Sequence, residues 1–393
     1  MNNTSFTLFD DPVIREQLLP FTYTRAIADI RIGISTLKEK WQHFLGVEKI
    51  QIKTVRYLQG KYGENSYPST FINASINPNE DIVRAILSLN ENEYLCQENL
   101  IIAIASNTTT EHGAKKKVRY EGILITIERP WDIFKKNEAI LTADFYELTK
   151  NRKTQILSAT NTLIGPADRL FIEAGATVEA SILNTNTGVI YIGEDAEIME
   201  GCVVRGPLAM CAHSAIKLAG KIYGATTLGP HVKVGGEVNN SVIFGYSNKG
   251  HDGFLGNSVI GEWCNLGADT NNSNLKNNYS DVKVWSYSEM QEINTGQQFC
   301  GLFMGDHSKS GINTMFNTGT VVGVSANIFG GGFPPKHIPS FCWGGADELV
   351  TFEKDKAFEV AEKMMERRGL ALTLYDKNIL TTVFEETKPF RKK

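Results

Sequence analysis

Residues 192–234 read IGEDAEIMEGCVVRGPLAMCAHSAIKLAGKIYGATTLGPHVKV, with an apolar residue at every sixth position. These eight positions are Ile192, Ile198, Val204, Met210, Ile216, Ile222, Leu228 and Val234. A helix would repeat its apolar residues every 3.6 positions, and a half-buried strand every two. A six-residue period is typical of a parallel β-helix, in which each hexad forms one flat face and its aliphatic residue points to the axis of a prism. Because a single coil cannot bury that residue, the coils must stack.

The hexad register extends beyond this stretch in both directions. It returns at Phe316, Val322 and Ile328, and a shorter run at Ile164, Leu170, Ala176 and Ile182 starts the predicted stack. We therefore predict a β-helix over residues 155–345. Two segments break the rule, at 239–256 and 271–304, and loops that leave a solenoid often carry its function. The sequence assigns no role to the insert at 279–304.

Residues 1–150 have a different pattern, in which short apolar runs alternate with segments whose apolar residues recur at the spacing of a helix. Strands are predicted at 6–10, 100–105 and 122–127, and helices at 30–45 and 79–89. Such alternation favours a Rossmann-like α/β domain. A helix at 139–148 would connect this domain to the β-helix. A single C-terminal helix is predicted at 352–368, within a tail at 352–393.

Composition narrows the functional classes. The 393 residues carry a net charge of −4, which gives no general attraction to nucleic acid or anionic lipid. No apolar run reaches membrane-spanning length, and Met1–Thr4 lack the features of a signal peptide. The six cysteines are not at zinc-ligand spacing, and we expect reduced thiols in a cytoplasmic protein.

His251 is the strongest candidate for chemistry. It lies in Lys249-Gly-His-Asp-Gly-Phe-Leu-Gly256, where the glycines would let the imidazole stand at a coil corner facing a cleft. Imidazole is a common general base near neutral pH. The alternative is a corner histidine bonded to a backbone carbonyl, with no catalytic role.

The same region resembles the acetyltransferase half of the bifunctional N-acetylglucosamine-1-phosphate uridyltransferases. The resemblance is carried by Lys249-Gly250-His251, Leu255-Gly256, Ile260-Gly261, Asn265-Leu-Gly267-Ala268 and Asn274. It implies that His251 deprotonates a sugar amine, that Glu237 and Asn274 contact substrate or orient the base, and that backbone near Ala268 contacts acetyl-CoA. Lys221 stands at the spacing of a family arginine and would hold a phosphate. Asn239 and Phe254 replace a family lysine and tyrosine.

The N-terminal region resembles a sugar-nucleotidyltransferase domain, and nearly the whole chain resembles a family in which such a domain is fused to a left-handed β-helix. Arg15 follows the first strand at the family spacing, and Arg25 and Arg31 lie in the following Leu18–Arg31 segment. The resemblance implies nucleotide binding by these arginines. The family's loop glycines are replaced by Asp10-Asp11-Pro12, whose two carboxylates would repel a triphosphate unless a divalent metal such as Mg²⁺ lay between them. Asn73 replaces a metal-binding aspartate, so the metal ligands are unknown.

Three functions remain open at this point. The first is a transferase that uses acetyl-CoA to acetylate an amino-sugar phosphate, with or without nucleotidyl transfer to a sugar-1-phosphate. The second is nucleotidyl transfer alone, with the β-helix as a trimerisation scaffold. The third is a sugar-nucleotide sensor without catalysis. In each case the resemblance implies small-molecule partners and a homotrimer. From the charge and the apolar runs we expect neither nucleic acid nor a membrane as a partner.

Overall fold

The computed structural model describes residues 5–64, 69–106 and 116–391; Met1–Thr4, considered above for a signal peptide, lie outside these ranges. The chain divides into two compact units. The first contains residues 1–18, 24–30 and 35–129, and the second contains residues 19–23, 31–34 and 130–393. None of the described helices has both the length and the apolarity needed to cross a membrane.

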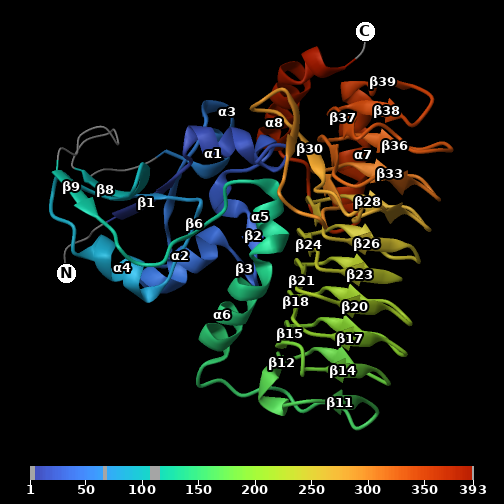
Figure 1. Ribbon diagram of the computed structural model, residues 1–393, viewed down its shortest axis with the longest axis horizontal. Helices are drawn as coiled ribbons and strands as arrows, with labels where there is room; N and C mark the ends of the chain where they lie inside the picture. The colour runs from blue at the N-terminus through green and yellow to red at the C-terminus, as the bar shows by residue number, and fades with distance from the viewer. Residues whose placement is uncertain (1–4, 65–68, 107–115, 392–393) are drawn as a thin grey trace. The chain divides into compact units, whose positions relative to one another are not determined.

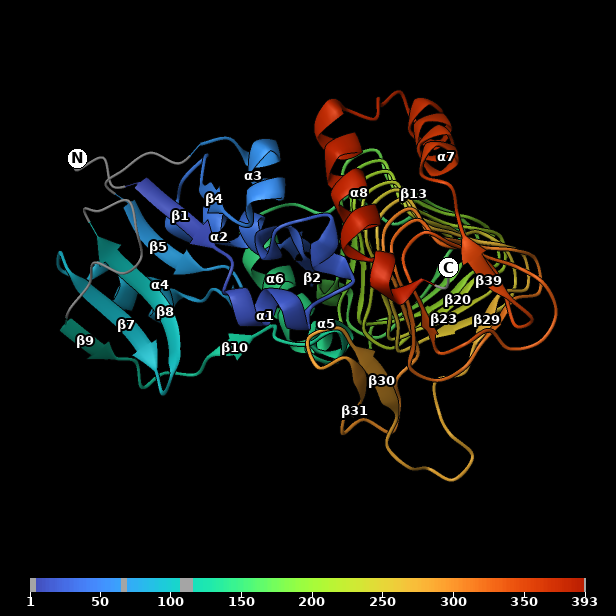
Figure 2. The same cartoon turned by 90° about the horizontal axis from the view of Figure 1, so that it is seen from above.

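A six-stranded mixed sheet forms the centre of the first unit. Its strand order is β4 (Gln51–Lys53), β1 (Ser5–Phe9), β5 (Ser69–Asn73), β8 (Leu100–Ser106), β7 (Glu93–Gln97) and β9 (Lys116–Arg119). β1 is parallel to both β4 and β5, so these three strands end at one edge of the sheet (Figure 2). The short strands β6 (Ile76–Asn77) and β10 (Ile125–Thr126) pair antiparallel. The edge where parallel strands end is where open α/β sheets usually bind ligands.

The helices of the first unit are α1 (Pro12–Gln17), α2 (Leu37–Leu45), α3 (Arg56–Tyr62) and α4 (Glu80–Leu87). The prediction of a helix over 30–45 is wrong for its first seven residues, which include β2 (Arg31–Ile32) and β3 (Ser35–Thr36). Gly33 has φ of +66°, so a right-handed helix cannot continue through it. α2 begins only after Thr36, which forms a capping box with Glu39. The helix predicted over 79–89 is α4, and the Asn79 side chain caps it by accepting from the Ile82 N–H.

The second unit is a parallel β-solenoid with three sheets (Figure 1). The first sheet contains β11 (Thr162–Ile164), β14 (Ile182–Asn184), β17 (Val203–Arg205), β20 (Lys221–Tyr223), β23 (Glu237–Asn239) and β26 (Phe254–Gly256). The second contains β12 (Leu170–Ile172), β15 (Ile190–Ile192), β18 (Leu208–Met210), β21 (Thr226–Leu228), β24 (Val242–Ile243), β27 (Val259–Ile260), β32 (Leu302–Met304), β35 (Thr320–Val322) and β37 (His337–Ile338). The third contains β13 (Thr177–Val178), β16 (Glu197–Ile198), β19 (Ala215–Ile216), β22 (Lys233–Val234), β25 (Asn248–Lys249), β28 (Asn265–Leu266), β33 (Lys309–Ser310), β36 (Asn327–Ile328), β38 (Cys342–Gly344) and β39 (Leu349–Thr351).

The hexad residues form the core of this solenoid as predicted. All eight residues of the register from Ile192 to Val234 are buried, with at most 1% of each exposed. The proposed start of the stack is wrong at Ile164 and Ile182, which are 41% and 40% exposed. Their neighbours Leu163 and Leu183 face the core instead. Successive side chains of a strand point to opposite faces. The inward-facing residue of β11 and β14 is therefore the middle residue of each strand, one position away from the residue that the hexad register predicts.

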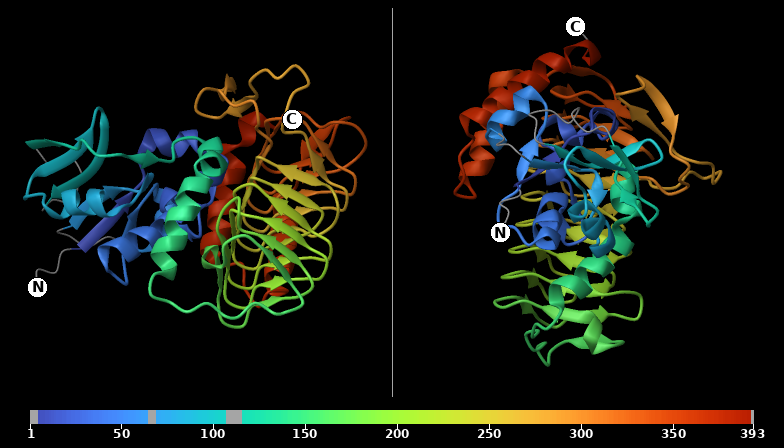
Figure 3. Two further views of the ribbon diagram at one scale, coloured as in Figure 1. Left: turned by 60° about the horizontal axis from the view of Figure 1, so that its bottom comes forward. Right: turned by 90° about the vertical axis from the view of Figure 1, so that its left-hand side faces the viewer.

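The two irregular segments are accommodated differently. The segment around 239–256 stays within the coils as β23 to β26. The insert instead forms an antiparallel hairpin of β30 (Lys283–Ser286) and β31 (Gln291–Asn294), which projects from the stack (Figures 2 and 3). β29 (Asn271–Asn272) and β34 (Met315–Phe316) pair parallel on either side of this insert along the chain.

Among the residues of the second unit that the structure describes, four α-helices accompany the solenoid. α5 (Pro130–Lys135) and α6 (Asn137–Thr149) belong to this unit. We predicted the second of these helices, over 139–148, as the connection between the domains, and it packs on the solenoid because Leu141 and Phe145 are buried against Phe171 and Ala209. The C-terminal tail has two helices rather than one, α7 (Lys354–Glu366) and α8 (Leu374–Glu386). Thr373 and Asp376 form a capping box for α8, a signal that was present in the sequence.

Candidate active site

His251 lies at a corner of the solenoid, two residues beyond the end of β25, and its side chain is exposed. Ala268 occupies the equivalent position two residues beyond β28, which pairs with β25. Because β25 and β28 pair, His251 and Ala268 lie at the same corner on adjacent coils. The corner faces outward rather than into the prism.

A cavity of about 510 Å³ opens at this corner and contains both residues in its wall. The sequence had not indicated three charged residues that also line it, Lys217, Asp252 and Asp269. The full lining is Met199, Lys217, Leu218, Gly235, Gly236, Gly250, His251, Asp252, Ala268 and Asp269. The size is within the range of small-molecule sites.

Gly236 allows the backbone to approach closely beside His251. It has φ of +67°, and a Cβ atom there would lie 2.7 Å from the Cα of Asp252. Any side chain at this position would therefore push against the segment that carries the histidine, and only glycine adopts this conformation without strain.

Lys249 is buried inside the prism, at the register position that the preceding coil fills with Val234. Its Nζ donates to the carbonyl oxygens of Gly235 at 3.0 Å and His251 at 2.7 Å. Burial lowers the pKa of Lys249 to about 8. The side chain thus fixes the backbone of His251 from within the core.

Glu237 and Lys221 lie next to each other on β23 and β20 of the adjoining sheet. The Lys221 Nζ lies 3.4 Å from Glu237 Oε2, and the Tyr223 hydroxyl donates to Glu237 Oε1 at 2.6 Å. Burial and this carboxylate raise the pKa of Tyr223 to about 12. Neither Glu237 nor Lys221 lines the cavity, and Lys221 is already paired with a carboxylate.

Asn274 also lies outside the cavity wall. Its Nδ2 donates to Asn257 Oδ1 at 2.8 Å, near the end of β26. The structure therefore brings His251 and Ala268 into one cavity, whereas Glu237, Lys221 and Asn274 occupy the neighbouring face.

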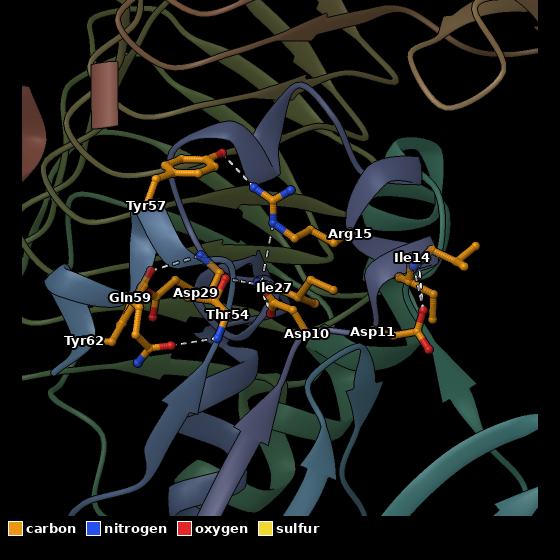
Figure 4. Close-up of polar contacts among 12 residues, drawn as sticks. Asp10, Asp11, Ile14, Arg15, Ile27, Asp29, Thr54, Tyr57, Gln59 and Tyr62 are labelled. Atoms are coloured by element: carbon orange, nitrogen blue, oxygen red, sulfur yellow. Dashed lines mark hydrogen bonds and ion pairs between the residues drawn. The ribbon is translucent and has the colours of Figure 1, made fainter. Parts of the chain in front are cut away.

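The loop after β1 shows how the two predicted carboxylates are used. Asp11 Oδ1 accepts from the backbone N–H groups of Val13 and Ile14 and so caps α1. Asp10 turns the other way and accepts from the Thr54 hydroxyl at 2.5 Å and from the Ile27 N–H at 2.9 Å (Figure 4). Burial raises the pKa of Asp10 to about 6.

Arg15 belongs to the same cluster of polar contacts as Asp10. Its Nη2 donates to the Tyr57 hydroxyl at 2.7 Å, and its Nε lies 3.9 Å from Asp10 Oδ2 (Figure 4). Arg25 is buried in the same unit. Arg31 belongs to the second unit, where its Nη1 donates to the Ile34 carbonyl at 2.6 Å. The three arginines predicted to bind nucleotide are therefore not gathered in one compact unit.

The side chains at the ends of β1 and β5 do not form a site for a divalent cation. Asn73 is fully buried, its Oδ1 accepts from the Ser75 N–H and hydroxyl, and its Nδ2 donates to the Ile101 carbonyl. Asp10 and Asp11 are separately bonded to protein donors, as described above. Across the described ranges, no three His, Cys, Asp or Glu side chains group as metal ligands. We assign no step to Mg²⁺.

Comparison with known proteins assigns the N-terminal region. Residues 6–153 match the family model described as sugar nucleotidyl transferase. This region is therefore similar to sugar nucleotidyl transferase domains. It precedes the solenoid, so the predicted fold class is confirmed.

Two curated relatives extend the similarity into the solenoid. The chain is 29% identical over 267 residues to a bifunctional sugar-1-phosphate nucleotidylyltransferase/acetyltransferase of Sulfurisphaera tokodaii, covering 67% of this chain and 59% of that protein. It is 29% identical over 235 residues to the bifunctional protein GlmU of Methanocaldococcus jannaschii, covering 60% and 47%. The chain thus spans about half to three-fifths of these relatives' lengths. The resemblance to GlmU-like proteins is confirmed.

Among solved structures, the polySia-specific acetyltransferase NeuO is similar with a TM-score of 0.27 and 14% identity, over 49% of this chain and 82% of that one.

Proposed function

We propose that this protein is an acyltransferase that transfers the acetyl group of acetyl-CoA to the amine of an amino-sugar phosphate. The observation that carries the proposal is the exposed His251 in the wall of a cavity of about 510 Å³, one coil from Ala268. The names of the curated relatives, which combine nucleotidyl transfer with acetyl transfer, support the same chemistry.

In this mechanism His251 acts as the general base. It removes a proton from the sugar amine as the nitrogen attacks the thioester carbonyl, so that a C–N bond forms and the C–S bond breaks. The departing thiolate takes up a proton and leaves as free CoA. Lys249 holds the His251 carbonyl from inside the prism, and this fixes the position from which the imidazole works. The Ala268 N–H would polarise the thioester carbonyl, since the N–H groups of Gly267 and Asp269 donate to the carbonyls of Ser310 and Asp252.

Lys217 is better placed than Lys221 to bind the sugar phosphate. Lys217 lines the cavity, and its Nζ lies close to Gly250, within 3.8 Å of where a Cβ would be. Lys221 is paired with Glu237 outside the cavity. Lys217 forms no ion pair with another residue that the structure describes, so its ammonium beside the base supplies the positive charge that a phosphate monoester requires.

Replacement of His251 tests the proposal directly. We expect His251→Ala to reduce acetylation of glucosamine-1-phosphate by acetyl-CoA at least 100-fold, because general-base catalysis contributes about that much. Release of CoA thiol measures the rate. His231→Ala is a matched control at another solenoid corner. Full activity of His251→Ala would refute the assignment, and binding of substrates without turnover by the wild-type protein would favour a sensor instead.

Nucleotidyl transfer is the second candidate, and the family match over residues 6–153 favours it. The geometry after β1 opposes it, because Asp11 occupies the N–H groups that would otherwise face a phosphate. Pyrophosphate release from a nucleoside triphosphate and a sugar-1-phosphate measures this activity. Release that is lost in Arg15→Gln would establish it.

A further inference from the structure

A second cavity, of about 580 Å³, lies between the C-terminal end of α7 and the third sheet of the solenoid. No residue of its wall is shared with the cavity of His251. Four of its lining residues are cations: Lys233 and Lys309 on the sheet, and Arg367 and Arg368 just beyond α7. No Asp or Glu side chain lines it.

These cations have no carboxylate partner. Within the part of the chain that the structure describes, none of the four forms an ion pair within 4.0 Å. Lys309 donates only to the backbone carbonyl of His307, at 2.7 Å. Burial and His213 lower the pKa of His231, and the charges of Arg368 and Lys233 add to this effect. Such uncompensated charge attracts an anion.

The repeat arranges the sheet side of the cavity as a ladder. Lys233, Asn248, Asn265 and Lys309 occupy paired positions on four successive coils. Since adjacent strands lie about 4.8 Å apart, the two lysines are roughly 14 Å apart with two amides between them. Neither amide side chain makes a hydrogen bond to another described residue, so both offer donors to a ligand. An extended anion suits this spacing better than a single phosphate.

The remaining wall is apolar. Tyr246 and Trp263 belong to a ladder of stacked rings, with their centroids 4.3 Å apart, and Met364 lies opposite on α7. Because the ring faces are covered by one another, the rings present their edges to the cavity. These edges and the thioether give a surface for an organic group beside the charged column.

We propose that this cavity is a second ligand site that binds a nucleoside di- or triphosphate. The phosphates would lie among the four cations that line the cavity, Lys233, Lys309, Arg367 and Arg368, with the nucleoside against Tyr246, Trp263 and Met364. The ligand would join α7 to the solenoid face, since two of the cations come from each element.

Calorimetric titration of the full-length protein with ADP tests the proposal. We expect saturable binding that weakens at least tenfold in Arg368→Gln and in Lys309→Met, and that weakens as NaCl rises from 50 to 300 mM. Arg205→Gln, an exposed arginine of β17 outside the cavity, is the matched control and should bind as the wild type does. Pyrophosphate alone should bind more weakly than ADP. Equal binding of the two would remove the nucleoside from the proposal.

Two further measurements make the result decisive. Bound ADP should slow tryptic cleavage after Arg367 and Arg368 at least fivefold, a readout that ADP binding in either other site would not produce. His251→Ala should retain this binding, so failure of the acyltransferase assignment would leave it intact. Absence of binding, or unchanged binding in Arg368→Gln, would overturn the proposal even if Lys309→Met failed to fold.

Discussion

At the scale of single residues, Lys249 is the most informative departure from the repeat. It replaces an aliphatic residue in the core and bonds the carbonyls of Gly235 and His251. Removing a buried charge offsets the loss of its two hydrogen bonds, so Lys249→Met should change stability at pH 7 by less than about 1 kcal/mol. Acyl transfer should nevertheless fall about tenfold in kcat with little change in KM, because the base is no longer held. Lys283→Met, at an exposed site, is the control.

The pH dependence of unfolding provides an independent check on Lys249. Its folded pKa of about 8 lies below the unfolded value of 10.5, so the native state loses its proton first as pH rises. The stabilisation of the wild type relative to Lys249→Met should therefore increase between about pH 8 and 10.5, by at most about 1.4 kcal/mol per pH unit. A pH-independent difference in urea unfolding would contradict the buried ammonium.

Asp10 should show the opposite trend. Its folded pKa of about 6 lies above the unfolded 3.8, so the unfolded state loses its proton first and stability falls as pH rises from about 4 to 6. Asp10→Asn keeps an acceptor for the Ile27 N–H and has no such loss. Its stability relative to the wild type should rise by on the order of 2 kcal/mol between pH 4 and 7, measured by urea unfolding. Asp11→Asn, which preserves the cap of α1, is the control and should lack this trend.

At the scale of elements, a ladder of rings runs along one corner of the solenoid. Its members, each with positive φ, are His213, His231, Tyr246, Trp263 and His307. Trp263 stacks on Tyr246 and is 7% exposed. Trp263→Ala should destabilise the solenoid by about 3 kcal/mol, whereas Trp263→Phe, which keeps a ring in the stack, should cost about half as much. Equal losses in guanidinium unfolding would show that the stack contributes nothing.

The same elements show what sequence alone could predict. The hexad identifies the core because burial of an aliphatic residue recurs every six positions from Ile192 to Val234. The hexad does not identify the ladder of rings, because the members of the ladder are not evenly spaced in the sequence. His213 and His231 are 18 residues apart, His231 and Tyr246 are 15 apart, and the insert separates Trp263 from His307. His251 and Ala268 lie one coil apart and could be placed together. Lys217 lies two coils earlier, and no local motif connects it to them.

At the scale of the whole molecule, the corner that carries His251 exposes two large apolar side chains. Two residues beyond β19 and β33, at positions equivalent to His251, Leu218 and Ile312 are 65% and 70% exposed. Leu218 also lines the cavity of His251. A neighbouring copy of the solenoid would cover these side chains and complete a groove for acetyl-CoA, as in the homotrimer implied by the family resemblance.

We therefore expect sedimentation equilibrium to give a mass three times the 43.6 kDa of one chain. Ile312→Asp should dissociate the assembly, because association would bury an unpaired carboxylate. It should also abolish acyl transfer, although His251 is unchanged, since half of the groove would be missing. Ile123→Asp places the same charge on an exposed residue of the first unit and should leave both mass and rate unchanged. A wild-type monomer with full acyl transfer would show that one solenoid suffices, and the groove would then have to be built from the residues around Leu218 alone.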